Sequence, residues 1–164
     1  MPVHFFGAIG YSYKSMLVNI HGSGKNSVFT QTDYLAQVLE PYIQNFLEAF
    51  GAICGVLQFM EDSNSVHGHK SLWNSCTLWR ASKGIVLFPH PAISPDMNPI
   101  EKCWRRIKQA LYRRQIQPTT EVEMVVAVIE EWEKIPQEWI DNLIEKQEYW
   151  VHELVKRCGW STPN

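Results

Sequence analysis

Two acidic residues are the chain's best candidates for chemistry, because each is expected at the end of a structural element. Asp62 follows the apolar run Val56–Met60 and enters a polar, turn-prone stretch. Glu101 falls in the first turn of a predicted helix. Carboxylates are natural ligands for hard divalent cations, and a pair of such ions can stabilise the attacking and leaving oxygens of a phosphoryl transfer. The two acids therefore predict metal-assisted phosphoryl transfer if the fold brings them together.

Each acid also has an ordinary structural explanation. A strand-end Asp such as Asp62 can start a turn through its own side chain. Glu101 stands three residues after Asn98, which is the spacing of a helix capping box. The local sequence leaves the structural and the chemical interpretations of both residues open.

The elements that would position Glu101 are well marked. Asn98 is a favourable N-cap, and Pro99 suits the first helical position, where a missing N–H costs nothing. A helix is therefore predicted to begin at Asn98. Ile100, Trp104 and Ile107 fall on one apolar face of this helix, with Glu101 on a flank.

The run Ser94–Trp104, SPDMNPIEKCW, together with Asp62 and His67, resembles the DDE transposases of the Tc1/mariner type. Their later motifs are a strand-end Asp, a His a few residues later, and SPDxNPIExxW. By this resemblance Asp62 and Glu101 are the second and third metal-binding acids, and His67 is the family's His. Asn98, Pro99 and Trp104 fall on further motif positions. The early segment Phe6–Ile9 is similar to the family's W-G-x-I strand, with Phe in place of Trp.

The resemblance implies an RNase H-like fold, Mg²⁺ or Mn²⁺ as cofactor, DNA as partner and a nuclear location. It also implies a first catalytic Asp on a strand upstream of Phe6–Ile9, which this chain does not match. Asp33 is the only Asp before Asp62, and a helix cap explains it better. We therefore expect a catalytic-domain remnant that is inactive alone and that folds poorly or associates with itself. A non-enzymatic DNA- or protein-binding descendant, or an open reading frame without selected function, remain alternatives.

Composition is compatible with one intracellular domain. The 164 residues are 45% hydrophobic, enough for one core of ordinary size. No apolar run is long enough to span a bilayer, and the first residues lack the pattern of a signal peptide. The four cysteines are widely spaced, which argues against a zinc ribbon or a disulfide framework.

Charge is unevenly distributed, although the net charge is only −2. Basic residues crowd residues 101–114, whereas residues 121–148 are mostly acidic. Arg105 and Lys108 share the flank of Glu101 on an ideal helix, and Lys102 and Arg106 lie on another side. We predict that these four cations contact DNA phosphates, with an exposed, solvated helix as the alternative.

The remaining pattern predicts a mixed α/β fold of the RNase H-like type without its first strand, followed by helices alone. Residues 3–9 and 15–20 read as an antiparallel pair, and residues 21–26 as a glycine-rich turn. We expect an RNase H-like domain over 1–117 and a helical C-terminal extension over 118–164, packed on the same domain. The other predicted elements are a helix over 32–50 that kinks or restarts near Pro41, a helix over 69–82, a buried strand over 85–88, and helices from Thr119 to Ile135 and from 137 to 157.

Overall fold

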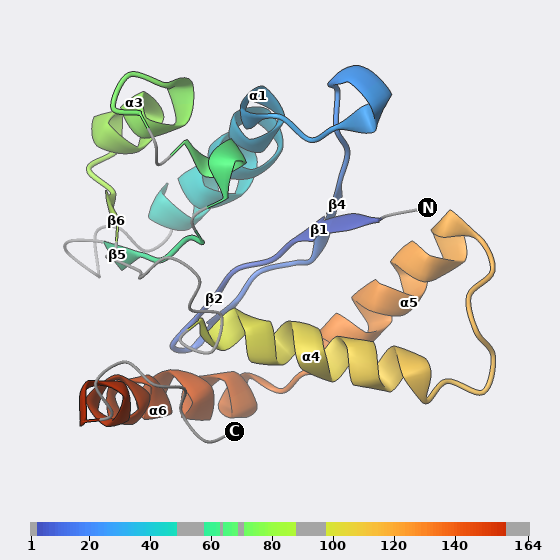
Figure 1. Ribbon diagram of the computed structural model, residues 1–164. Coiled ribbons are helices and arrows are strands. Elements are labelled where there is room, and N and C mark those ends of the chain that lie inside the picture. The colour runs from blue at the N-terminus through green and yellow to red at the C-terminus, as the bar shows by residue number, and fades with distance from the viewer. Residues whose placement is uncertain (1–2, 49–57, 63, 69–70, 88–97, 157–164) are drawn as a thin grey trace. The chain divides into compact units, whose positions relative to one another are not determined.

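The computed structural model describes residues 3–48, 58–62, 64–68, 71–87 and 98–156, with Gln58 and residues 147–156 as backbone alone. The chain divides into two compact units. One is formed by residues 1–19 with 94–164, and the other by residues 20–93 (Figure 1).

The first unit begins with four short strands. β2 (Ile9–Gly10) pairs antiparallel with β3 (Tyr13–Lys14), and β1 (His4–Phe6) neighbours β4 (Val18–Ile20). The turn between β2 and β3 places Ser12 at a φ of 55°. The predicted hairpin connection is confirmed. The first predicted strand, 3–9, is divided into β1 and the start of β2. β3 lies in the predicted connection, and β4 is the part of the second predicted strand, 15–20, that forms.

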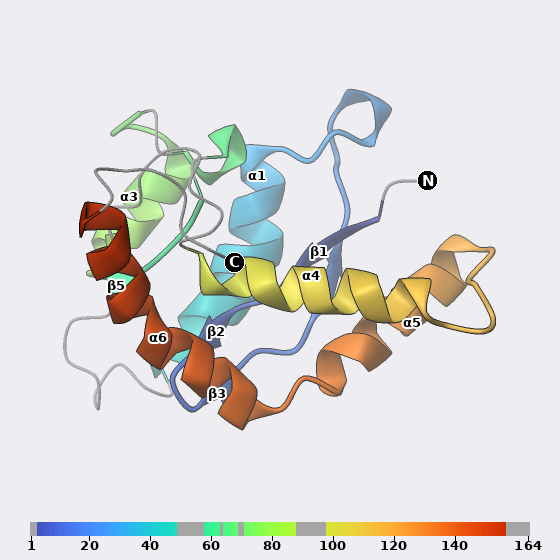
Figure 2. The same cartoon turned by 60° about the horizontal axis from the view of Figure 1, so that its bottom comes forward.

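Three helices complete this unit: α4 (Pro99–Tyr112), α5 (Glu121–Glu133) and α6 (Gln137–Lys156). α4 begins as predicted, because Asn98 is its N-cap and Pro99 its first residue. Thr120 caps α5 in a reciprocal capping box with Glu123. α5 and α6 both contact α4, and α6 also contacts β2 (Figures 1 and 2).

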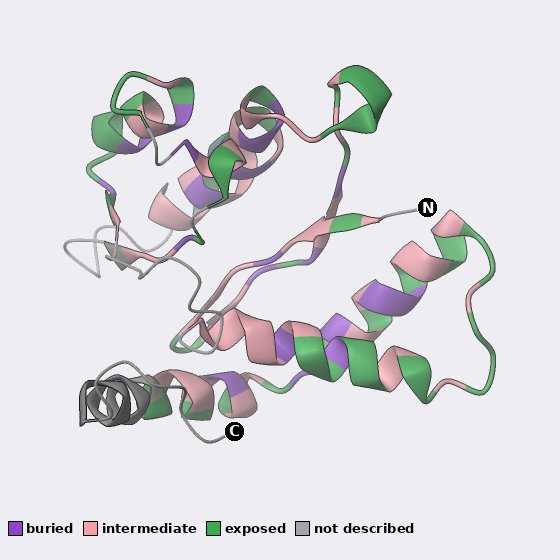
Figure 3. Cartoon of the chain, viewed as in Figure 1, coloured by how far each residue is buried: buried purple, intermediate pink, exposed green. Residues whose placement is uncertain are grey.

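The core of this unit lies where α4, α5 and the start of α6 meet the strand segment (Figure 3). Trp132 is its largest fully buried side chain. The Trp132 indole N–H donates to the Ser15 carbonyl at 2.9 Å, so the largest core side chain has its polar atom satisfied. Trp104 stacks on Trp132 with ring centroids 5.4 Å apart. The buried members of the core are Leu17, Cys103, Ile107, Val128, Trp132, Ile135 and Ile140.

Lys14 ties the hairpin to the end of α5. Its ammonium donates to the carbonyls of Trp132, Glu133 and Ile135 at 3.2, 3.3 and 2.9 Å. These carbonyls lie at or just beyond the negative end of the α5 dipole, where a cation is favourable. The Trp132 carbonyl also accepts from the Ile135 N–H at 3.0 Å. Gln137 and Asp141 of α6 hydrogen-bond the same hairpin, through the Gly10 carbonyl and the Ser12 N–H.

The sequence pattern predicts that the apolar side of α5 consists of Val122, Val125, Val126, Ile129 and Trp132, which is partly wrong. Trp132 is buried as expected, but Val122 is 72% exposed and Val126 is 50% exposed. Ala127 and Val128 are buried instead. The sequence offers two adjacent apolar stripes on this helix, and packing against α4 selects one of them.

The second unit is built on a helix that begins earlier than predicted. Thr30 caps α1 (Gln31–Tyr34), and the chain stays helical through the π-helical η2 (Leu35–Ile43) to Glu48. The helix continues through Pro41 rather than restarting there, because π-helical bonding accommodates a residue that has no N–H. The glycine-rich turn ahead of it contains the single 3₁₀ turn η1 (Lys25–Ser27).

Asp62 lies after the first strand of a parallel pair, and a second helix stands between the two strands in the sequence. β5 (Gln58–Phe59) pairs with β6 (Val86–Leu87), which confirms two predicted strands where they are described, although Val86 is exposed rather than buried. η3 (Ser65–His67) follows Asp62. α3 (Ser75–Ser82) begins later than predicted, because Asn74 caps it through the Thr77 N–H at 2.9 Å. Trp73 is 84% exposed, although helical spacing among aliphatic neighbours favours core packing for most of the chain's tryptophans.

The mixed α/β class is confirmed, with strands and helices in the predicted order. In the described part of the chain the strands form three separate two-stranded sheets. The RNase H-like sheet, its missing first strand and the boundary at 117/118 stay predictions. Residues 94–97 of the SPD motif, the expected start of the second helix at 69 and the helix stop after 157 lie outside the described residues.

Candidate active site

Asp62 stands three residues beyond the end of β5, and His67 fixes its side chain. His67 Nδ1 lies 2.8 Å from Asp62 Oδ1 and 3.1 Å from the Asp62 carbonyl oxygen. Both partners are acceptors, so Nδ1 carries the proton and donates. The Asn64 N–H also donates to Asp62 Oδ1, at 3.1 Å. The Asp62 side chain is 55% exposed, so an oriented carboxylate faces solvent.

His67 itself is enclosed and electrostatically tuned. Burial lowers the pKa of His67, but its hydrogen bonds with Asp62 and the charges of Glu61 and Asp62 outweigh burial and raise the pKa above its usual value. The Tyr34 ring packs on the imidazole with centroids 4.4 Å apart. The Asp62–His67 pair is therefore formed within one unit of the structure.

A buried ion pair underlies Asp62, and sequence reasoning missed it. Glu61 and Arg80 are almost fully buried, and Arg80 Nη1 donates to Glu61 Oε2 at 2.9 Å. Arg80 Nη2 donates to the His67 carbonyl at 2.8 Å. The Tyr34 hydroxyl donates to the other Glu61 oxygen, and burial followed by the Glu61 charge raises the pKa of Tyr34 well above its usual value. The sequence signal that could have found this pair is Arg80 itself. An Arg on the buried side of a predicted helix needs a buried acceptor.

Glu101 occupies the first turn of α4, as predicted. Its N–H donates to the Asn98 carbonyl at 3.0 Å, and the Asn98 side chain accepts from the Ile100 N–H at 3.4 Å. A carboxylate at this position is favoured by the helix dipole. The reciprocal bond from Glu101 back to the cap stays a prediction. Trp104, the last motif residue, packs against the core.

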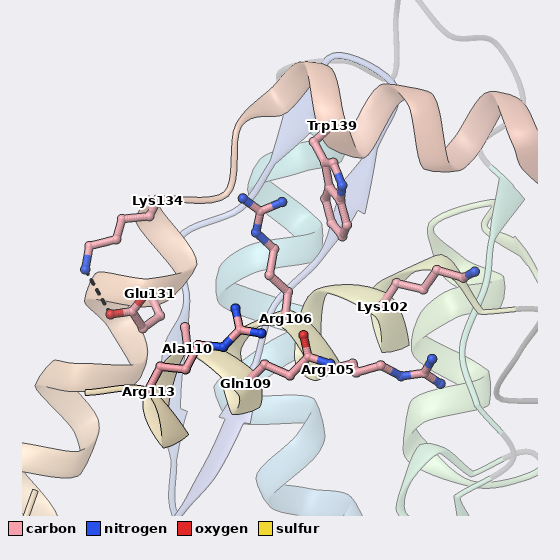
Figure 4. Close-up of a pocket in the computed structure, with 9 residues that line it drawn as sticks. All are labelled: Lys102, Arg105, Arg106, Gln109, Ala110, Arg113, Glu131, Lys134 and Trp139. Carbon is pink, nitrogen blue, oxygen red and sulfur yellow. Dashed lines mark hydrogen bonds and ion pairs between the residues drawn. The ribbon is translucent and has the colours of Figure 1, made fainter. Parts of the chain in front are cut away.

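The four basic residues of α4 that were predicted to contact DNA do not group as expected. Lys102, Arg105 and Arg106 line one pocket of about 580 Å³, whereas Lys108 does not (Figure 4). Arg105 and Lys108 were expected on the same flank of α4. The pocket extends around α4 far enough to include Arg105 but not Lys108. The other lining residues are Gln109, Ala110, Arg113, Glu131, Lys134 and Trp139.

We call this pocket the basic groove. Arg106 lies over the ring of Trp139, with its guanidinium carbon 4.9 Å from the ring centroid, so α6 helps to hold one of the cations in place. Glu131 is the acidic member of the lining, and it pairs with Arg114 at 2.8 Å and Lys134 at 2.9 Å. These contacts lower the pKa of Glu131, Lys134 first and Arg114 second, so its charge is already compensated. The groove therefore presents an excess of positive charge.

Asp33 takes no part in a site of this kind. Its carboxylate accepts hydrogen bonds from the Thr30 N–H, the Thr30 hydroxyl and the Ser23 N–H at 2.8, 2.7 and 3.1 Å. Bonds with Thr30 and then Ser23 hold the pKa of Asp33 far below its usual value. The structure confirms that Asp33 is a capping residue, at N3 rather than at the helix start.

Within the described residues, no group of three or more His, Cys, Asp or Glu side chains is arranged to hold a metal ion. Asp62 belongs to the second unit and Glu101 to the first, so their approach to one another stays a prediction. Their chemistry fits Mg²⁺, which takes oxygen ligands, keeps several waters and needs only one or two carboxylates from the protein. None of the described helices is long and apolar enough to cross a membrane.

The mixed α/β fold, an oriented strand-end Asp and a Glu in the first turn of a helix are features of a nuclease-type catalytic domain. The model of the DDE superfamily endonuclease family matches residues 3–123, and the chain belongs to that family as a Tc1/mariner-like DDE transposase domain. The chain is similar to the transposable element Tc3 transposase of Caenorhabditis elegans, with 26% identity over 134 residues. That match covers 82% of this chain and 39% of the Tc3 protein.

Proposed function

We propose that this chain is part of the catalytic domain of a transposase that cuts and joins DNA, with Asp62 and Glu101 as two of its metal-binding acids. The observation that carries the proposal is the Asp62–His67 pair just after β5, within the residues 3–123 that match the DDE superfamily endonuclease family. Glu101 supplies the second carboxylate from the first turn of α4. DNA as the partner and the nucleus as the location follow from this proposal.

The residues fit a divalent cation such as Mg²⁺ or Mn²⁺. When bound, such ions would stabilise the negative charge that develops on the attacking and leaving oxygens of a phosphodiester. This chain's residues would supply the oxygen ligands. His67 orients the Asp62 carboxylate, and the first turn of α4 holds Glu101. The Pro99 ring and the Asn98 cap fix the first turn of α4 and so the backbone at Glu101.

We also propose that the chain does not cut DNA by itself. The family uses three acids, and the one earlier Asp of this chain, Asp33, is committed to its capping box. Two carboxylates can still hold a hydrated Mg²⁺ weakly, but placing two ions for in-line displacement is harder.

The basic groove is proposed as a contact for DNA phosphates. Arg105, Arg106 and Arg113 line it, and the structure pairs none of these three with an acid in the described part of the chain. The adjacent Arg114, by contrast, is paired with Glu130 and Glu131. Binding through phosphates alone would be salt-sensitive and independent of DNA sequence. The groove also supports the second candidate function, a non-enzymatic DNA-binding protein derived from such an element.

The test is a plasmid-nicking and DNA-binding assay of the full chain with Mg²⁺ and with Mn²⁺. We expect DNA binding without nicking or joining. Metal-dependent cleavage that Asp62→Asn or Glu101→Gln abolishes would overturn the proposed inactivity and support the proposed acids. Mn²⁺ binding that neither substitution weakens would contradict the metal site and leave the non-enzymatic function.

A further inference from the structure

Arg80 contacts both sides of the segment that carries Asp62. One guanidinium nitrogen donates to Glu61, the residue directly before Asp62, and the other donates to the carbonyl of His67. His67 in turn donates to Asp62. A single rigid side chain from α3 therefore connects the strand end to the turn that orients the carboxylate.

Tyr34 makes a parallel pair of contacts from α1. Its hydroxyl donates to Glu61, and its ring packs on the imidazole of His67. Glu61 and His67 are therefore each contacted from two helices of the same unit, α1 and α3. Asp62 remains the exposed member of the group, while Glu61, Arg80 and Tyr34 are buried.

The buried Glu61–Arg80 pair is better explained by the orientation that it gives to Asp62 than by a contribution to the stability of the fold. A buried ion pair must offset the desolvation of two charges, and apolar residues of similar volume often serve stability equally well. Arg80 also carries a buried Nε–H that finds no acceptor among the described residues. The planar fork of Arg80, however, reaches two acceptors at once, which a Lys ammonium on a flexible stem does not reproduce.

We infer that Arg80, together with Glu61 and Tyr34, forms a buried clamp whose role is to position Asp62 and His67 for metal binding. This inference rests on the proposed function. Arg80 is 2% exposed, so it is a positioning residue and does not touch the metal or DNA. Partners that orient metal ligands from behind typically change metal affinity by 10- to 100-fold when they are removed.

The test compares Mn²⁺ binding, followed by electron paramagnetic resonance, between the full chain and the double variant Glu61→Met/Arg80→Met. The double variant removes both charges together, so no unpaired charge is left in the core. In a double variant that keeps the circular dichroism spectrum of the full chain, we expect a Kd for Mn²⁺ about tenfold weaker and loss of the NMR signature of the proton between His67 Nδ1 and Asp62. Unchanged affinity and an unchanged His67 proton signal in a folded double variant would overturn the clamp.

A second variant covers the case in which the double variant does not fold. Arg80→Lys keeps the charge but gives up one of the two contacts, so we expect weaker Mn²⁺ binding and a shifted His67 signal; wild-type values for both would overturn the inference. Lys83→Met, an exposed change at the end of the same helix, is the matched control and should change neither.

Asp62→Asn separates this inference from the proposed function. If Asp62→Asn leaves Mn²⁺ binding unchanged, the proposed metal site fails, and the His67 proton signal alone decides whether Arg80 positions Asp62. If Asp62→Asn weakens binding but the folded Arg80 variants do not, the inference fails and the metal site stands.

Discussion

His67 Nδ1 lies 2.8 Å from Asp62 Oδ1, within a turn that also returns the Asn64 N–H to the same oxygen. The imidazole is mostly enclosed and the carboxylate is half exposed. Because the His67 imidazole holds one oxygen of the exposed Asp62 carboxylate, it sets the direction from which a cation can bind to that carboxylate.

Replacing His67 with Ala should weaken Mn²⁺ binding by about tenfold, because Asp62 loses the donor that orients it. Isothermal titration with Mn²⁺ measures the change. His4→Ala, an exposed position on β1, is the control and should leave the affinity unaltered. Equal affinities in the two variants would show that His67 does not orient a metal ligand.

The core around Trp132 should be the chain's most sensitive point for stability. Trp132→Ala removes a fully buried side chain and its hydrogen bond to Ser15, and should lower the free energy of unfolding by about 3–5 kcal/mol. Trp73→Ala, at an exposed position, should change it by less than about 0.5 kcal/mol. Urea denaturation of the pair measures both values, and similar losses would contradict the burial described.

Lys14 should stabilise the end of α5 through its three carbonyl contacts. Lys14→Met keeps much of the aliphatic stem but removes the charge, and should cost about 1–2 kcal/mol. Lys25→Met changes an exposed lysine in η1 and serves as the control. If chemical denaturation gives the same stability for both variants, the cap contributes nothing measurable.

The capping box at α1 should make part of the stability acid-sensitive. The folded-state pKa of Asp33 lies below the unfolded value of about 3.9, so its contribution is fully present above that value and is lost as pH falls through the folded pKa. Asp33→Asn should therefore destabilise the chain at pH 7 and matter progressively less as the pH falls below about 4.

Thermal denaturation across this pH range measures the effect. Glu40→Gln, at an exposed position of the same helical stretch, is the matched control. A difference between wild type and Asp33→Asn that stays constant with pH would contradict the charged cap.

DNA binding should depend on the basic groove. Arg106→Gln/Arg113→Gln should lower affinity for a labelled random duplex and reduce the slope of log K against log salt by about 2, since each lost phosphate contact removes about 0.9. Charge reversal at Arg105 and Lys108 should weaken binding too, with the larger share from Arg105, the groove residue. Fluorescence anisotropy at several salt concentrations measures both.

The control for the groove is Lys25→Gln/Lys83→Gln, which removes two exposed cations of the second unit. An unchanged salt slope in the groove variant, or an equal loss in the control, would remove the groove from the DNA-binding surface.

Local signals in the sequence were sufficient for the start of α4, the capped start of α5 and the hairpin at β2 and β3, because each depends on caps and turns a few residues apart. The start of α3 was wrong because Asn74, rather than the onset of apolar spacing, stops the helix from extending backwards. Local pattern could not select between the two apolar stripes of α5, since that choice is made by α4.

In the candidate site, too, contacts between residues close in the sequence could be predicted and contacts between distant residues could not. The resemblance to the family motif predicted Asp62, His67 and Glu101 as site residues, and their roles stay predictions. The contact between Asp62 and His67 is observed, and it is local in the chain. The Glu61–Arg80 pair joins residues 19 positions apart, and Tyr34 joins Glu61 from 27 positions away. Contacts of this range depend on how β5, α1 and α3 pack, which periodicity does not encode.

Whether Asp62 and Glu101 share one metal is most directly measured by NMR of the ¹⁵N-labelled full chain titrated with Mn²⁺, because a bound paramagnetic ion broadens the amide signals around its ligands. We predict that signals around Asp62 and around Glu101 broaden at the same Mn²⁺ concentration, and that Asp62→Asn abolishes both effects. Broadening around one acid alone, or broadening around Glu101 that survives Asp62→Asn, would contradict a shared site.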